Sequence, residues 1–149
     1  MKKYFYVTVL FIVVFMTSGC GEKNSLSCYE KIHDNFKQTL FINYNEEKTK
    51  VESASIEIAV NMKDADLSLY KCGKETAPEC IEALIAKYNL GCDDMLKNCK
   101  VLDKSDIKFT FKADIKEDKL EEYFNKISTT LPINQMKSKL ELKQGLTCE

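Results

Sequence analysis

Hydrophobic and polar positions divide the chain into an apolar N-terminal segment and a longer part with mixed patterns. The N-terminal segment starts with the positive pair Lys2–Lys3 and continues with an uncharged, mostly apolar run over residues 4–16. This run has the length of a signal-peptide core and is shorter than the roughly 20 residues that a membrane-spanning helix needs. The small residues 17–19 then precede Cys20, which is the order of a lipobox. We therefore expect residues 1–19 to be a lipoprotein signal peptide and Cys20 to carry a thioether-linked diacylglycerol.

Alternating apolar side chains predict a β-hairpin over residues 39–61. Every second residue is apolar in 39–44 and again in 56–61, and the polar stretch 45–48 fits the turn between them. A later segment, residues 107–114, alternates most cleanly and predicts a strand with one buried face. The apolar positions of the three strands are Leu40, Ile42, Tyr44, Ile56, Ile58, Val60, Ile107, Phe109, Phe111 and Ala113.

Capping signals predict a helix that begins after Thr76. Glu79 follows this threonine by three residues, the spacing of a capping box, and Pro78 suits the first turn. Apolar residues then recur at helical spacing until Gly91, where we expect the helix to end. The predicted buried stripe consists of Ile81, Leu84, Ile85 and Tyr88.

Three more helices are expected in the second half of the chain. The first is short, with a cap at Asp93 or Asp94, and runs toward the next cysteine. The second opens with Asp114 and Glu117, which are spaced as another capping box. The third starts at Pro132 and ends at a glycine cap, Gly145 followed by Leu146. The apolar stripes of the last two helices are Leu120, Tyr123, Phe124, Ile127, Ile133, Met136 and Leu140.

This order, β-β-α-α-β-α-α after the signal peptide, predicts an α+β fold in which a small, curled antiparallel sheet packs against helices. Because the residues directly after Cys20 are polar, we expect residues 20–27 to consist of the acylated cysteine and a tether. From there to the C-terminus no stretch rich in Pro, Gly or Ser divides the chain. We therefore expect residues 28–149 to form a single disulfide-stapled α+β domain, with a core that is marginal without the disulfides.

Six cysteines follow Cys20, an even number in a chain expected to be exported, so up to three disulfides are predicted among fifteen formal pairings. The simplest pairing joins Cys28 with Cys148 and closes the domain. Within one straight helix, Cys92 and Cys99 would have Cα atoms about 10.5 Å apart, beyond the roughly 7 Å that a disulfide tolerates. Either that helix is broken or these two cysteines pair elsewhere. The six disulfide candidates are Cys28, Cys72, Cys80, Cys92, Cys99 and Cys148.

Several of these segments resemble a known kind of protein. The early first cysteine, the hairpin TLFINYNEEKTKVESASIEIAV, the strand DIKFTFKADI and the end KLELKQGLTCE are similar to small α+β lipoproteins of low-GC Gram-positive bacteria, of the YehR-like type. The resemblance implies lipid anchoring and a Cys28–Cys148 bridge, and it supplies no activity. The four cysteines within 72–99 depart from it and suit an oxidising periplasm. The Gram type of the source therefore stays open.

Charge and composition exclude several functions. Without residues 1–19 the chain keeps 20 lysines and 23 acidic residues, a net charge near −3, and it contains no arginine at all. Nucleic acid is therefore not an expected partner, because its binding needs a concentrated basic face. The spacings of the inner cysteines contain no Cys-x-x-Cys, so we expect no zinc site and no thiol-redox site. The chain also lacks a glycine-rich phosphate loop, and no cofactor is predicted.

No group of residues predicts catalysis. His33 is the one histidine, and we expect it to lie on a polar segment before the first strand. The acidic pairs 46–47, 93–94 and 121–122 suit a turn, a helix cap and a solvated helix face. Phe41 is the one candidate anchor for a partner, since it lies on the otherwise polar face of its strand, although we expect a helix or the tether to cover it.

The sequence therefore predicts a lipid-anchored lipoprotein that is not an enzyme and acts as a binding or interaction module at the cell envelope. It would sit on the extracytoplasmic side, at the outer membrane of a Gram-negative cell or the surface of a Gram-positive one. The anchor makes the membrane one partner, and an envelope protein is a possible second. Two alternatives stay open: an accessory lipoprotein of a secretion, pilus or plasmid-exclusion system, and an exported inhibitor or small-ligand binder.

Overall fold

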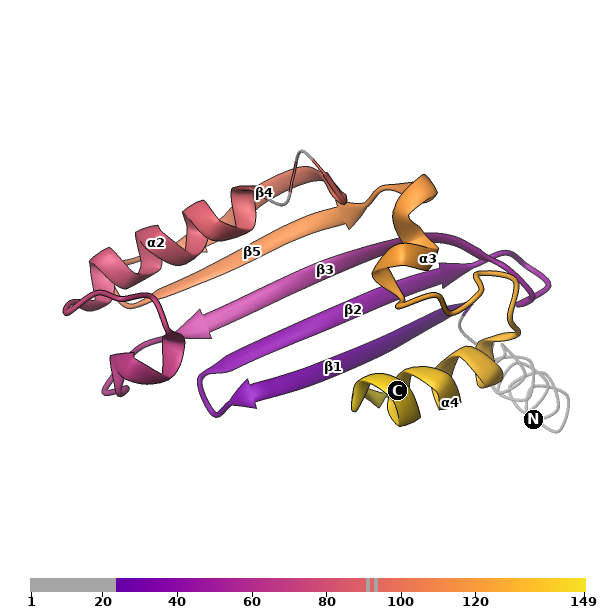
Figure 1. The fold of residues 1–149 in the computed structure, drawn as a ribbon, viewed down its shortest axis with the longest axis horizontal. Helices are drawn as coiled ribbons and strands as arrows, with labels where there is room; N and C mark the ends of the chain where they lie inside the picture. Colours follow the sequence, from indigo (N-terminus) through magenta and orange to yellow (C-terminus); the bar gives the residue numbers. More distant parts are fainter. Residues whose placement is uncertain (1–23, 91, 93) are drawn as a thin grey trace, which may run out of the picture.

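The computed structural model describes residues 24–90, 92 and 94–149, so the expected signal peptide and Cys20 lie outside the described residues. These residues form an α+β fold with one open antiparallel sheet in the order β4-β5-β3-β2-β1-β6 (Figure 1). The strands are β1 (Ser25–His33), β2 (Phe36–Tyr44), β3 (Val51–Asn61), β4 (Leu96–Lys104), β5 (Lys108–Ile115) and β6 (Thr147–Cys148). The helices are α2 (Ala77–Leu90), α3 (Leu120–Tyr123) and α4 (Ile133–Gln144), with short 3₁₀ turns η1 (Leu67–Tyr70) and η2 (Glu117–Lys119).

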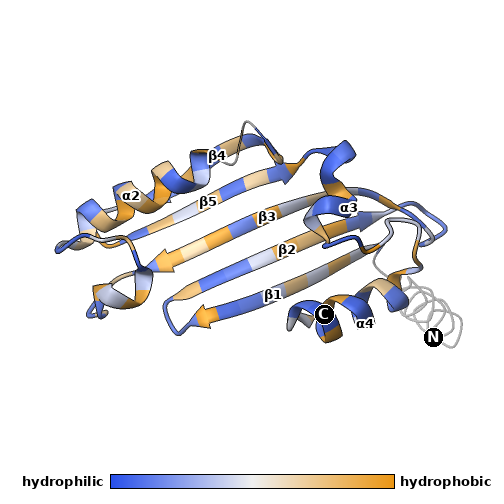
Figure 2. Ribbon diagram, viewed as in Figure 1, coloured by the Kyte–Doolittle hydropathy of each residue, from blue (hydrophilic) through white to orange (hydrophobic). Residues whose placement is uncertain are grey.

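The register of the strands separates a buried face of the sheet from a polar one. Cys28, Leu40, Ile56 and Ala113 lie side by side across β1, β2, β3 and β5, and all four are buried. We call this side the covered face. Figure 2 shows the underlying alternation as orange and blue blocks along the strands. The expected hairpin is confirmed as β2–β3, and the expected strand over 107–114 is confirmed as β5.

Helix α2 covers the β4–β5 side of the covered face (Figure 1). Thr76 directly precedes the helix, and its hydroxyl donates a hydrogen bond of 2.9 Å to Oε2 of Glu79, a side-chain contact between the two residues of the expected capping box. Near the other end of the helix, the Tyr88 ring stacks on Phe111 with 5.6 Å between centroids and lies 6.4 Å from Phe109. A local capping signal and a tertiary aromatic contact therefore fix the two ends of this helix.

Helices α3 and α4 cover the β1–β2 side of the same face. Gln38 Nε2 donates a hydrogen bond of 3.5 Å to the Tyr123 hydroxyl, which ties α3 to β2. Met136 and Leu140 of α4 are fully buried. As expected, α4 follows a proline and ends at Gly145, which has a φ of 68° and adopts the left-handed conformation that glycine tolerates best.

The N-terminal part of the domain differs from the expected order, because Ser25–His33 form strand β1 instead of a tether and a polar segment. Leu26 and Cys28 are the only fully buried side chains of this strand. Their alternation spans too few positions to stand out beside the charged residues that follow. Strand β1 is held by β2 on one side and by the two-residue β6 on the other.

A second difference lies after α2, where β4 replaces the expected short helix toward Cys99. Of the nine residues of β4 only Leu96 is buried, since this edge strand pairs with β5 alone. Its pairing is interrupted twice by bulges, a common feature of exposed edges. Because β4 is an exposed, bulged edge strand, its residues do not alternate between apolar and polar, and no strand could be predicted there.

The expected capping box at Asp114 is also wrong. Asp114 belongs to β5, whose alternation continues to Ile115, and its Oδ2 accepts a hydrogen bond of 2.8 Å from Asn98 Nδ2. The chain then makes the turn η2 and the single helical turn α3, with Lys116 at the start and no side-chain cap. The expected apolar stripe is nevertheless used, because Leu120, Phe124 and Ile127 are all buried.

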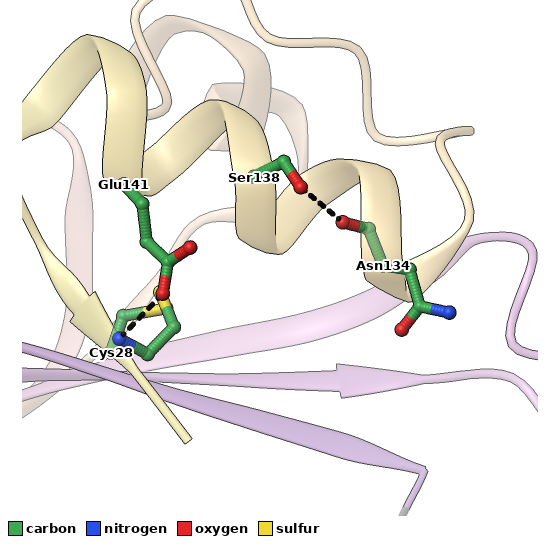
Figure 3. Close-up of a disulfide and its surroundings, with 5 residues drawn as sticks. Cys28, Asn134, Ser138 and Glu141 are labelled. Atoms are coloured by element: carbon green, nitrogen blue, oxygen red, sulfur yellow. Dashed lines mark hydrogen bonds between the residues drawn. A yellow bond between two sulfur atoms is a disulfide. The ribbon is translucent and has the colours of Figure 1, made fainter.

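Three disulfides connect the expected cysteines. Cys28 pairs with Cys148 across β1 and β6, with Cα atoms 4.0 Å apart and a sequence separation of 120 residues. Figure 3 shows Glu141 of α4 pointing toward this bridge, where its Oε1 accepts a hydrogen bond of 3.4 Å from the Cys148 backbone N–H. The bridge Cys72–Cys80 joins the first half of α2 to the segment before it, and Cys92–Cys99 joins the segment after α2 to β4. No described helix contains both Cys92 and Cys99, because α2 ends at Leu90 and Cys99 lies in β4, so these two cysteines pair with a Cα separation of 6.1 Å.

Burial raises the pKa of Tyr44, Tyr88 and Tyr123 to about 12, above the ordinary value of 10. The unfolded chain therefore releases these protons at lower pH than the folded chain does. We expect the full stability below pH 10 and a progressive loss between pH 10 and 12. Urea midpoints measured across this window test the expectation, and Tyr123→Phe should make the fall smaller. A midpoint that stays constant to pH 12 would contradict it.

Candidate interaction surface

The opposite side of the sheet, which we call the open face, has no described helix packed on it. Tyr29, Thr39, Glu57 and Lys112 form a row across four strands next to the buried row, and none of them is buried. The same holds for the neighbouring rows. By register, the open face consists of Ser27, Tyr29, Lys31, Lys37, Thr39, Phe41, Asn43, Ser53, Ser55, Glu57, Ala59, Lys97, Lys100, Asp103, Lys108, Thr110, Lys112 and Asp114.

Positive charge predominates on the open face, which holds six lysines and three acidic residues, although the whole chain has a net charge of −1. Lys31 lies directly opposite Lys37, and Lys100 directly opposite Lys112. Like charges in such cross-strand positions are destabilising. Lys31 is already paired with Asp34 at 2.8 Å, so the repulsion that a bound anionic group would relieve is that between Lys100 and Lys112.

Two aromatic rings lie among these lysines. Lys37 Nζ is 4.3 Å from the centroid of the Tyr29 ring, and Lys112 Nζ is 6.0 Å from that of Phe41. Phe41 is half-buried, and no described helix covers it; the other expected cover, the tether, lies outside the described residues up to residue 23. The Phe41 ring is therefore placed where a partner can reach it.

Two hollows mark the ends of the open face. The larger, of about 380 Å³, lies around Ala59, and its lining includes Lys37, Asp103 and Lys108. Lys108 and Asp103 form an ion pair of 2.9 Å, which lowers the pKa of the aspartate. The second hollow, of about 230 Å³, is lined by Asn43, Ser53, Ala54, Ser55, Lys97, Asn98, Asp114, Ile115 and Glu117. Small side chains in the sheet leave both hollows polar and shallow.

The space between sheet and helices is much smaller. A hollow of about 100 Å³ lies beside Cys28, with Gln38, Tyr123 and Leu146 in its wall. Ligand pockets usually have volumes of about 300–1,000 Å³. This hollow is therefore too small for a typical ligand.

His33 lies at the end of β1, which corrects the expected position before the first strand. Its ring is half-buried and packs edge-on against Tyr70 at 4.5 Å and Phe36 at 5.5 Å between centroids. Its Nε2 is buried and makes no hydrogen bond to the described residues. The imidazole is thus part of the packing between the β1–β2 turn and η1.

The acidic pairs take structural positions where they are described. Glu46 and Glu47 lie in the β2–β3 turn and are exposed. In α3, Glu121 Oε1 accepts a hydrogen bond of 3.3 Å from the Thr129 backbone N–H, and Glu122 pairs with Lys119 at 3.1 Å. Asp93 lies outside the described residues. No pair is joined to a histidine or a nucleophile in these contacts.

Within the described part of the chain, no group of three or more His, Cys, Asp or Glu side chains is arranged to hold a metal ion. None of the helices in residues 24–90 and 94–149 has the length and apolar character needed to cross a bilayer.

The sequence analysis found Phe41 but missed the open face as a surface. Its lysines are scattered over four strands between positions 31 and 112, so only the strand register brings them together. Comparison of the chain with protein-family models, with curated proteins and with solved structures finds no match. The resemblance to YehR-like lipoproteins therefore stays a prediction.

Proposed function

We propose that the protein is an exported lipoprotein, anchored by lipid on Cys20, that acts as a non-enzymatic interaction module at the cell envelope. The observation that carries this proposal is the open face, a polar sheet surface that holds half-buried aromatic rings among lysines and has no described helix on it. The proposed location is the extracytoplasmic side, the outer membrane if the cell has one and the cell surface otherwise. Three disulfides are consistent with an oxidising compartment.

The tether between the proposed anchor and the domain is short. The backbone oxygen of Asn24 accepts a hydrogen bond of 2.8 Å from the Tyr44 N–H, so this residue is fixed at the end of the sheet. Four residue steps separate it from Cys20, a reach of at most about 14 Å. A lipid on Cys20 would therefore hold the sheet close to the membrane surface.

A small-ligand binder is the second candidate. The hollow of about 380 Å³ at the end of the open face reaches the lower part of the usual range for ligand sites. Its polar lining would suit a small charged molecule better than an apolar one. An accessory role in a larger envelope system differs from the main proposal only in the partner that the open face would take.

We expect Cys20→Ser to abolish acylation. In cells fed an alkyne-tagged fatty acid, the unchanged protein should carry the tag and the variant should fall to background, because the serine hydroxyl cannot form the thioether. Asn24→Ser changes the tether but keeps the thiol, so it should be tagged like the unchanged protein. Equal tagging of the Cys20→Ser variant, or no tagging of the unchanged protein, would contradict the proposal.

A further inference from the structure

We infer that the partner of the open face is the anionic headgroup surface of the bilayer that holds the anchor, so that the sheet lies flat on the membrane. This inference rests on the proposed lipid anchor. Three observations support it: the distribution of charge between the two sides of the domain, the position of the aromatic rings, and the length of the tether.

Charge is divided unevenly over the domain. Residues 24–149 contain 19 lysines and 22 acidic residues. The open face holds six of these lysines and three of these acidic residues. The remainder of the domain therefore has 13 lysines and 19 acidic residues. An anionic membrane attracts the open face and repels the other sides of the domain, so its field selects one orientation.

The lysines of the open face include two that lack a carboxylate partner. Lys100 and Lys112 face each other across β4 and β5, and no ion pair is formed by either with a described residue. A phosphate group placed above them would contact both and relieve their repulsion. These two lysines lie on the edge strand β4 and its neighbour β5, on the opposite side of the sheet from β1, so they reach the lipid surface only if the sheet lies flat on it.

Tyr29 on β1 and Phe41 on β2 lie toward the other side of the sheet from Lys100 and Lys112. Aromatic rings, tyrosine above all, favour the membrane–water interface, and lysine stems extend past them toward headgroups. The tether reaches at most about 14 Å from the fixed Asn24, which is enough for an anchor beneath the end of a flat sheet. The covalent anchor therefore keeps the Asn24 end of the sheet within about 14 Å of Cys20, and the charge of the open face would bring the rest of the sheet to the lipid surface.

Lysine footprinting of the mature, lipidated protein tests this arrangement. The protein is inserted into vesicles of phosphatidylcholine alone or with phosphatidylglycerol, acetylated with a water-soluble reagent, and analysed by mass spectrometry. On anionic vesicles we expect Lys37, Lys100 and Lys112 to react about five-fold more slowly, the factor expected for a lysine at such a surface. Lys139 and Lys143 of α4 are exposed and should react equally on both. The protection should vanish at 1 M salt, where the Debye length is about 3 Å.

Matched charge reversals separate this docking from general effects of the vesicles. Lys100→Glu with Lys112→Glu should remove the protection of Lys37, whereas Lys139→Glu with Lys143→Glu should leave it unchanged. If the intact mass shows acylation and the lysines react at equal rates on both kinds of vesicle, the proposed docking is wrong and the proposed anchor is retained. An unacylated chain would overturn both. Protection in native envelopes but not on anionic vesicles would assign the face to another envelope component and also overturn the inference.

Discussion

Replacement of Cys28 and Cys148 together by alanine is expected to lower the free energy of unfolding by about 4 to 5 kcal/mol, the largest effect of any disulfide in the domain. The bridge spans 120 residues, so its loss restores the most conformational freedom to the unfolded chain. It also holds β6 against β1, because these strands share only two register pairs. Urea unfolding of the double variant, which leaves no free thiol at this bridge, measures the loss.

The short bridge Cys72–Cys80 provides the matched comparison. Its loop spans 8 residues, and removing both cysteines should cost about 2 to 3 kcal/mol. The expected difference arises from loop length alone, since both variants lose one disulfide. Equal losses for the two double variants would show that closing the domain contributes nothing beyond the local bridge.

Phe111→Ala is expected to lower the free energy of unfolding by about 3 to 5 kcal/mol, because it leaves a cavity in the centre of the core. The ring is fully buried on the covered face and stacks with Tyr88 of α2. Its removal therefore weakens both the sheet and the attachment of the helix. Chemical denaturation measures the change, and near-UV circular dichroism should show the loss of the Tyr88 packing.

Phe41→Ala is the control for this substitution, since it removes the same side chain from the other face of the same sheet. The Phe41 ring is half-buried and has no helix over it among the described residues, so we expect a loss of about 1 kcal/mol. A loss as large as that of Phe111→Ala would show that Phe41 is covered. The open face would then not be the accessible surface that the proposed function requires.

Elements with local signals could be predicted from the sequence. Helix α2 begins directly after Thr76, whose hydroxyl bonds to the Glu79 carboxylate at 2.9 Å, and α4 lies between a proline and a glycine in the left-handed conformation. The β2–β3 hairpin alternates over many positions because β3 is central and buried on one face. In each case neighbouring residues contain the whole signal, so no knowledge of distant contacts is needed.

Elements fixed by distant contacts could not be predicted. Strand β1 depends on pairing with β2 and on a disulfide to residue 148, and β4 is an edge strand with one buried side chain. The open face could not be predicted for the same reason, because its lysines come from four strands and only the register makes them neighbours. Phe41 was found because its departure from the polar pattern is visible within its own strand.

The most direct test of the account is the intact mass of the protein extracted in detergent, measured before and after reduction and alkylation. We predict a chain that begins at acylated Cys20 and has six hydrogens fewer than the reduced form, the signature of three disulfides on a lipid anchor. An unacylated mass, or alkylation before reduction, would contradict the account of a stapled domain held at the membrane.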